Sequence, residues 1–126
     1  MLRILLLDDS LPDRELTEAA LGSLGIPHEL CWASDKTKFV ALLDRIQFDV
    51  VLSDSGGPSF AGKEALALVR RRQPEAAFIF LTGHTKGPFF DAMMRSGADG
   101  VLSKEDLGVI GETITHILRS RQSGRN

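Results

Sequence analysis

Short apolar runs alternate with longer amphipathic segments along the whole chain. The apolar runs, which predict strands, cover residues 2–7, 28–33, 48–53, 77–81 and 100–103. The segments between them carry apolar residues three and four positions apart, which is the spacing of one helix face. One such stripe is Phe39, Leu42, Leu43 and Ile46. The pattern therefore predicts five strands that alternate with five helices.

Polar residues, glycine and proline mark the ends of the predicted helices. Ser10 can cap the first helix, with Asp13 three residues later. The apolar positions of this helix are Leu16, Ala20 and Leu24. Ser34 or Asp35 can cap the second helix. The third helix begins at Gly62 and ends in a basic turn that we expect to be solvated, at Arg70, Arg71 and Arg72. The fourth covers 89–96, and the last carries the stripe Leu107, Ile110, Ile114, Ile117 and Leu118.

This alternation predicts an α/β fold, a doubly wound parallel sheet with helices on both faces and right-handed crossovers. Five strands suit the flavodoxin-like order 2-1-3-4-5. Residues 28–33 mix apolar and polar positions, which favours an edge strand, as this order requires. The first and third strands are then neighbours at the point where the strand order reverses.

Polar side chains follow four of the five predicted strands. Asp8 and Asp9 follow the first strand, Asp54 the third, Thr82 the fourth and Lys104 the fifth. Because the carboxyl ends of parallel strands meet at one edge of the sheet, we expect the three aspartates to converge on one crevice, with Thr82 and Lys104 on its rim.

Three carboxylates in one crevice repel each other unless a cation lies among them, and hard oxygen ligands favour Mg²⁺. An aspartate can act as a nucleophile and form an acyl phosphate. A hydroxyl and an ammonium, together with a metal ion, are the groups that developing phosphoryl oxygens require. The pattern predicts phosphoryl transfer onto Asp54.

Composition narrows the class of protein. A length of 126 residues suits one domain with its own core. The formal net charge of −2 gives no reason to expect nucleic-acid binding. No apolar stretch approaches the length of a membrane span, so we expect no membrane partner. A single cysteine, Cys31, excludes an internal disulfide and favours a cytoplasmic protein.

From about Arg3 to Leu118 the chain resembles the receiver domains of two-component response regulators. Asp8-Asp9 is similar to the acidic pair of that family, Asp54 to its phospho-acceptor, Thr82-Gly83 to its hydroxyl residue and following small residue, and Lys104 to its lysine. Pro58, Gly62 and the Gly97-Ala98-Asp99 segment are also similar to the family pattern.

The resemblance implies a role for each of these residues. Asp9, Asp54 and the Gly56 carbonyl would ligate Mg²⁺ directly, and Asp8 would act through water. Thr82 would donate a hydrogen bond to a phosphoryl oxygen, and Lys104 would form an ion pair with it. A sensor histidine kinase or a phosphotransfer protein would supply the phosphoryl group.

We expect a stand-alone receiver domain over residues 1–118, followed by a polar, basic tail over 119–126 that frays. Four large apolar residues lie close together in the fourth helix: Phe89, Phe90, Met93 and Met94. They indicate a contact surface formed by the fourth helix, the fifth strand and the fifth helix, the face that family members use for output or dimerisation. This face would bind a downstream protein or a second copy of the chain.

The chain departs from the family at two positions. Glu105 replaces the proline that usually follows the lysine, and Val101 replaces the usual aromatic residue. The alternative to a phosphorylated switch is therefore a degenerate receiver that acts as a constitutive protein-interaction scaffold. An enzyme with a free substrate is disfavoured, because Gly56 stands where aspartyl-phosphate phosphatases carry a second aspartate. We expect the chain to catalyse only its own phosphorylation and dephosphorylation.

Overall fold

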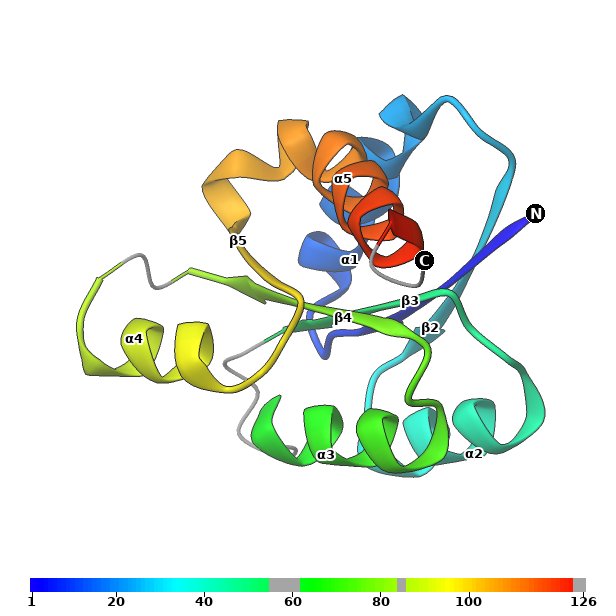
Figure 1. Ribbon diagram of the computed structural model, residues 1–126, viewed down its shortest axis with the longest axis horizontal. Coiled ribbons are helices and arrows are strands. Elements are labelled where there is room, and N and C mark those ends of the chain that lie inside the picture. The colour runs from blue at the N-terminus through cyan, green and yellow to red at the C-terminus, as the bar shows by residue number, and fades with distance from the viewer. Residues whose placement is uncertain (55–61, 84–85, 124–126) are drawn as a thin grey trace.

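The computed structural model describes residues 1–54, 62–83 and 86–123 (Figure 1). Its strands are β1 (Leu2–Leu7), β2 (His28–Ala33), β3 (Val50–Asp54), β4 (Ala77–Thr82) and β5 (Gly100–Ser103). Its α-helices are α1 (Leu11–Leu21), α2 (Lys36–Arg45), α3 (Gly62–Arg72), α4 (Pro88–Arg95) and α5 (Ile110–Ser123). Two 3₁₀ segments, η1 (Gly22–Leu24) and η2 (Lys104–Val109), precede β2 and α5. The order of these elements confirms the predicted alternation.

The strands form one parallel sheet in the order β2-β1-β3-β4-β5, which confirms the predicted flavodoxin-like topology. Helices α1 and α5 cover one face of the sheet, and α2 and α3 cover the other (Figure 1). Each face has its own apolar cluster. Leu21, Ile79 and Ile114 lie in the cluster under α1 and α5, and Phe39, Val69 and Phe78 lie in the cluster under α2 and α3. Burial of both faces explains why the central strands are apolar at nearly every position.

Most helices begin close to the residues that the sequence predicts. The buried face of α1 differs from the prediction. Ser10 Oγ accepts a hydrogen bond from the backbone of Asp13, so Ser10 is the cap as predicted. The stripe in α1 is wrong at Leu16, which is 60% exposed, whereas Thr17 and Leu21 are buried. Helix α1 turns Thr17 and Leu21, four residues apart, toward the sheet, and the tighter turn of η1 then brings Leu24 onto the same side.

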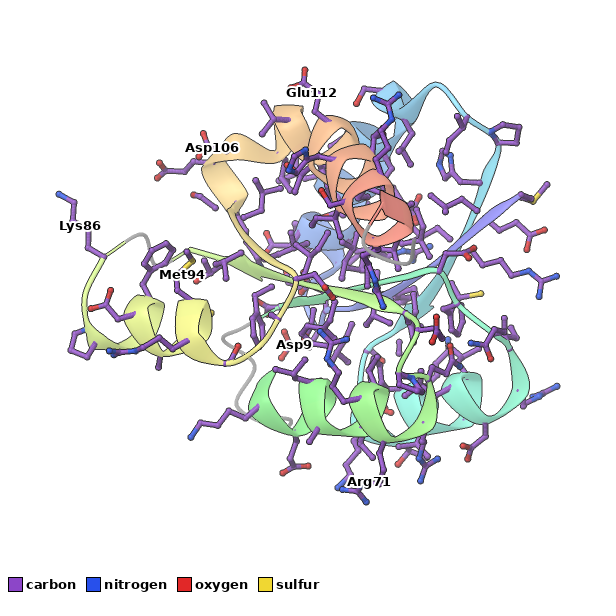
Figure 2. All side chains as sticks on the ribbon, viewed as in Figure 1. Asp9, Arg71, Lys86, Met94, Asp106 and Glu112 are labelled. Atoms are coloured by element: carbon purple, nitrogen blue, oxygen red, sulfur yellow. The ribbon has the colours of Figure 1, made fainter. Side chains whose placement is uncertain are left out.

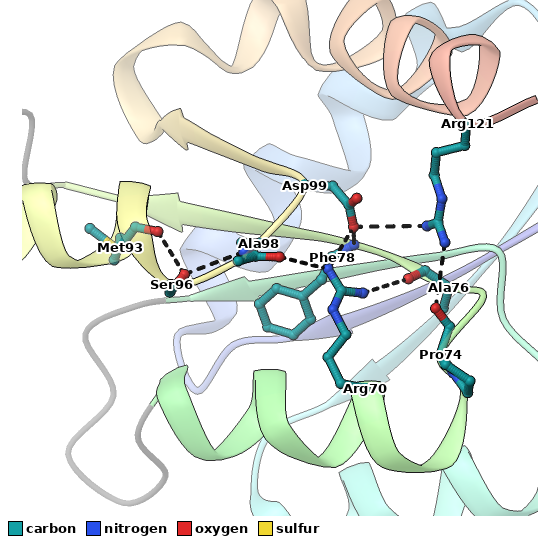
Figure 3. Close-up of polar contacts among 10 residues, drawn as sticks. Arg70, Pro74, Ala76, Phe78, Met93, Ser96, Ala98, Asp99 and Arg121 are labelled. Atoms are coloured by element: carbon teal, nitrogen blue, oxygen red, sulfur yellow. Dashed lines mark hydrogen bonds and ion pairs between the residues drawn. The ribbon is translucent and has the colours of Figure 1, made fainter. Parts of the chain in front are cut away.

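The amino-terminal edge of β4 and β5 is held by a polar network around Asp99 (Figure 3). Asp99 Oδ2 accepts hydrogen bonds from the backbone N–H of Phe78, at 2.8 Å, and from Arg70 Nη2, at 2.9 Å. Arg70 also donates to the carbonyls of Ala76 and Gly97. Arg121 of α5 forms a longer ion pair with Asp99, at 3.8 Å. Arg70 is therefore a structural link between α3 and the sheet, which corrects the expectation of a solvated side chain at this position, whereas Arg71 and Arg72 are exposed as expected.

Helix α5 continues to Ser123, whereas the sequence pattern predicts a tail that begins at residue 119. Apolar residues of α5 such as Ile110 and Ile114 pack on the sheet, and Arg121 adds the contact with Asp99. None of the helices in the described residues combines the length and the apolar character of a membrane span.

Candidate functional site

Three aspartates meet at the carboxyl edge of β1 and β3. Asp8 and Asp9 directly follow β1, and Asp54 is the last residue of β3. The register pairs Leu7 with Ser53, so the residues that follow them lie side by side. One carboxylate oxygen from each aspartate lies within 4.8 Å of the other two. Asp9, labelled in Figure 2, is exposed, whereas Asp54 is partly buried and Asp8 is buried. The predicted convergence of these three residues is thus present in the structure.

Asp8 is the buried member of this cluster, and its backbone and side chain are held separately. The indole Nε1 of Trp32 donates a hydrogen bond to the Asp8 carbonyl at 2.7 Å, which fixes the chain where β1 ends. Asp8 Oδ1 accepts a hydrogen bond from the backbone N–H of Ser10 at 2.9 Å. Among the described residues, Asp8 Oδ2 has no hydrogen-bond partner, although Lys104 Nζ lies 3.5 Å away. Burial raises the pKa of the Asp8 carboxyl above its ordinary value, while the Ser10 N–H and the Lys104 charge oppose the rise.

The ammonium of Lys104 contacts three carboxylates. Nζ lies 2.7 Å from Asp13 Oδ2 and 3.1 Å from Asp54 Oδ1, in addition to its contact with Asp8. Burial opposes the charge of this lysine, but the hydrogen bonds to Asp13 and Asp54 outweigh burial and raise the pKa of Lys104 to about 12. The lysine is therefore charged at neutral pH and lies directly beside Asp54.

Asp13 belongs to this site, although the sequence pattern assigned it only to the helix cap. In a capping box the side chain of the third helical residue reaches back to the N–H of the cap residue. Here the N–H of Ser10 is already bound by Asp8, and the Asp13 carboxylate turns to Lys104. The sequence signal for this role is the position of Asp13, in the first turn of the helix that follows Asp8 and Asp9. Its partner, Lys104, lies 91 positions away in the sequence, so the pairing required the fold.

Thr82 and the loop after β3 complete the comparison with the predicted site. Thr82 is buried at the end of β4, one position after Leu81, which pairs with Asp54. It therefore lies at the predicted edge of the sheet. Gly56 and Pro58 fall outside the described residues.

The two departures from the family pattern have visible consequences in the structure. The backbone N–H of Glu105 donates a hydrogen bond to Ser103 Oγ at 3.1 Å, a bond that a proline could not make. This bond begins the 3₁₀ segment η2. Val101 packs, partly buried, against the apolar cluster that contains Phe80 and Met93. The residues around Lys104 are thus held by the hydrogen bond of Glu105 and the packing of Val101. These contacts replace those that a proline and an aromatic residue would make.

The donor set fits a hard divalent cation. Three carboxylates lie together, and one buried oxygen, Asp8 Oδ2, has no hydrogen-bond partner in the described part of the chain. Lys104 supplies a single positive charge to them and also shares it with Asp13. A divalent cation would relieve the remaining repulsion, and oxygen donors of this kind match Mg²⁺. Asp8, Asp9 and Asp54 are the residues that would hold it.

Comparison with known proteins gives a consistent picture. Residues 4–115 match the family model described as the response regulator receiver domain. The chain is 31% identical over 104 residues to a response regulator receiver protein of Anaeromyxobacter sp. (strain Fw109-5). That alignment covers 82% of this chain and 43% of the relative, so the chain spans less than half of the relative's length.

Solved structures extend the likeness to three dimensions. The signal receiver domain of an HD domain-containing protein from Pseudomonas fluorescens Pf-5 is 25% identical, with a TM-score of 0.82, over 97% of this chain and 98% of that one. The chemotaxis response regulator CheY4 of Vibrio cholerae is 27% identical, with a TM-score of 0.72, over 95% and 98%. The fold, the strand-end residues and the family match agree, and the chain belongs to the response regulator receiver domain family of two-component signalling.

Proposed function

We propose that this chain is a phosphorylation-dependent switch that accepts a phosphoryl group on Asp54 in the presence of Mg²⁺. The donor would be a sensor histidine kinase or a phosphotransfer protein. The observation that carries the proposal is the position of Asp54: it lies in the cluster with Asp8 and Asp9, and its Oδ1 is 3.1 Å from Lys104 Nζ. The proposed nucleophile, the proposed cation ligands and a positively charged lysine therefore lie together, which supports the proposal.

In the proposed reaction a carboxylate oxygen of Asp54 attacks phosphorus, and a new P–O bond forms as the P–N bond of a phosphohistidine breaks. The electron pair of that bond stays with the imidazole. Lys104 offers its charge to the phosphoryl oxygens, and Thr82 offers its hydroxyl from the end of β4. Bound Mg²⁺ would neutralise charge on the phosphoryl group. The chain would act only on its own aspartate.

We propose that output passes through the face formed by α4, β5 and α5. Met94 of α4 is 59% exposed, while its neighbour Met93 is buried and Phe90 packs against the core. The side chain of Phe89 lies outside the described part of α4. The exposed Met94, on a helix that contacts β5, is the side chain that we propose for a contact with a downstream protein or with a second copy of this chain.

A constitutive scaffold is the competing function, and Val101 is the observation that favours it. A valine packed on the core cannot swing between two positions as an aromatic residue could. The intact set of Asp54, Lys104 and the acidic pair supports the switch instead. Phosphate dependence of partner binding separates the two functions, because a scaffold would bind its partner equally well with or without phosphate on Asp54.

The test is intact-mass spectrometry after incubation with acetyl phosphate and Mg²⁺. We expect wild type to gain one phosphoryl group, and neither Asp54→Asn nor wild type in EDTA to gain it. Trp32 provides a parallel signal, because its indole is bonded to the carbonyl of Asp8. Its fluorescence should change on addition of Mg²⁺, and the change should be weaker in Asp9→Asn. Equal labelling of wild type and Asp54→Asn would reject the proposal.

A further inference from the structure

Asp13 makes the shortest contact of Lys104, and neither the metal set nor the phospho-acceptor includes it. We propose that Asp13 is a positioning residue that competes with the phosphoryl group on Asp54 for the ammonium of Lys104 and so restrains phosphorylation. This inference rests on the proposed function of Asp54 and adds a regulatory contact to it.

The distances place Asp13 ahead of Asp54 in its hold on the lysine. Lys104 Nζ lies 2.7 Å from Asp13 Oδ2 and 3.1 Å from Asp54 Oδ1. A charge-assisted hydrogen bond of 2.7 Å is at the short end of the range for an ammonium and a carboxylate. The Asp13 side chain is 37% exposed, compared with 15% for Asp54. The shorter contact of Lys104 is therefore with the more exposed of these two carboxylates.

The backbone of Asp13 is held in place without any help from Lys104. Its N–H donates to Ser10 Oγ at 3.4 Å, and its carbonyl accepts a hydrogen bond from the buried hydroxyl of Thr17 at 3.0 Å. Asp13 also lies in the first turn of α1, where the helix dipole favours a negative charge. The fold thus presents this carboxylate to the lysine as a fixed partner, and Asp13 does not depend on the lysine for its position.

Charge explains why this partner would act as a brake. An ammonium has three N–H donors, and Lys104 faces three carboxylates among the described residues. A phosphoryl group on Asp54 would carry about two negative charges and would need at least one of these donors. The negative charge of Asp13 beside Lys104 would offset part of the positive charge that the phosphoryl group needs. The charge of Asp13 also opposes the approach of an anionic phosphodonor.

The substitution Asp13→Asn keeps the shape of the side chain and removes its charge, and Glu15→Gln is the matched control. Glu15 is exposed two residues further along α1 and has no side-chain hydrogen bond or ion pair among the described residues. Both variants remove one negative charge from the same helix. Only Asp13→Asn removes it from Lys104. Circular dichroism establishes that each variant is folded under the conditions of the assay.

The readout is the initial rate of phosphorylation by acetyl phosphate with saturating Mg²⁺. We expect Asp13→Asn to react about twofold to fivefold faster than both Glu15→Gln and wild type, the effect of one partly exposed ion pair on a rate. Asp13→Glu should return the rate toward wild type, because it restores the charge. A merely structural role of Asp13 would slow the reaction and would not produce this gain.

A second measurement follows the ion pair itself without phosphate. In the Mg²⁺-free protein, Asp13→Asn should shift the Lys104 side-chain NMR resonances, and Glu15→Gln should leave them unchanged. Unshifted resonances in Asp13→Asn would overturn the inference. So would equal or lower rates for Asp13→Asn in a chain whose wild type is phosphorylated, and in that case the proposed function would stand. A wild type that takes no phosphoryl group on Asp54 would overturn both.

Discussion

At the scale of single residues, the negative charges at the site outnumber the positive charges. Lys104 is the one cationic side chain that contacts Asp8, Asp13 and Asp54 among the described residues. Asp8 is buried with one oxygen that has no hydrogen-bond partner in the described residues, and burial raises the pKa of its carboxyl. A carboxyl whose pKa is raised by folding stabilises the folded chain below its unfolded pKa. That contribution is lost as the pH rises through the folded pKa. At a pH above that raised pKa, the buried charge of Asp8 therefore lowers the stability of the metal-free protein.

We expect Asp8→Asn to raise the free energy of unfolding at pH 7 when no Mg²⁺ is present. The amide oxygen can still accept the hydrogen bond from Ser10, while the buried charge is gone. The advantage of the variant should shrink as the pH falls through the folded pKa of Asp8, because the wild-type carboxyl then becomes neutral. Urea unfolding in EDTA across this pH range measures both effects.

Magnesium provides the control for this substitution. Mg²⁺ should stabilise wild type more than Asp8→Asn, because the variant lacks one of the three carboxylates. An Asp8→Asn protein that is less stable than wild type at pH 7 in EDTA would contradict the account of a strained, cation-binding cluster.

At the scale of elements, α3 packs closely against β4 where Gly62 meets Phe80. A Cβ on Gly62, the first residue of α3, would lie 2.6 Å from Phe80 Cε1. The Phe80 ring is buried and packs edge-on against Phe78, so it has little room to move. A glycine at position 62 is therefore required by the close contact between α3 and β4, independently of any special backbone angle.

We expect Gly62→Ala to lower the free energy of unfolding by about 1–3 kcal/mol, the usual effect of overpacking a core. Gly22→Ala is the control, since a Cβ there would meet no heavy atom of the described residues within 4 Å, apart from its own chain neighbours and helix backbone. Thermal or urea unfolding should show Gly22→Ala unchanged or up to about 1 kcal/mol more stable, because alanine favours helical backbone. Equal stability of the two variants would show that α3 can move away from Phe80 without cost.

At the scale of the whole molecule, the two ends of the parallel strands carry separate groups of charged residues. The carboxyl edge carries Asp8, Asp54 and Lys104, whereas the amino edge of β4 and β5 is held by Asp99 and Arg70. The second group links α3 to the segment that leads into β5 (Figure 3). The two groups share no residue.

The proposed output face is also a property of the whole molecule. We expect Met94→Ser to change the free energy of unfolding by less than about 0.5 kcal/mol, because the side chain is exposed. Phe90→Ser should cost about 1–3 kcal/mol, because the ring packs against the core. Sedimentation with and without beryllofluoride, and binding of a downstream protein, then report on the face. If Met94→Ser leaves both self-association and partner binding unchanged, the proposed face is wrong.

Much of the fold could be predicted from the sequence, because both faces of the sheet are buried and each strand except β2 is a near-continuous apolar run. Asp54, Lys104 and the acidic pair directly follow such runs, and this pattern alone was sufficient to place them at one edge of the sheet. The orientation of α1 could not be predicted in the same way. Leu16 and Thr17 are neighbours in the sequence, and packing against the sheet, not hydrophobicity, decides which of them is buried.

Contacts between residues that are distant in the sequence could not be predicted from the sequence pattern either. Asp13 fitted a helix cap, and only the proximity of Lys104 gives it another partner. Arg70 fitted a basic helix end, and only the fold brings Asp99 to it. In both cases the local sequence pattern explains the position of the residue in its helix. The side chain nevertheless pairs with an oppositely charged residue that is distant in the sequence.

The most direct test of the central claim identifies the residue that carries the phosphoryl group. The protein is incubated with acetyl phosphate and Mg²⁺ and treated with borohydride, which reduces an aspartyl phosphate to homoserine. Peptide sequencing by mass spectrometry then locates the product. We expect homoserine at position 54, and none at positions 8, 9 or 13. Homoserine at another aspartate, or at none while a phosphorylated receiver control is reduced, would contradict it.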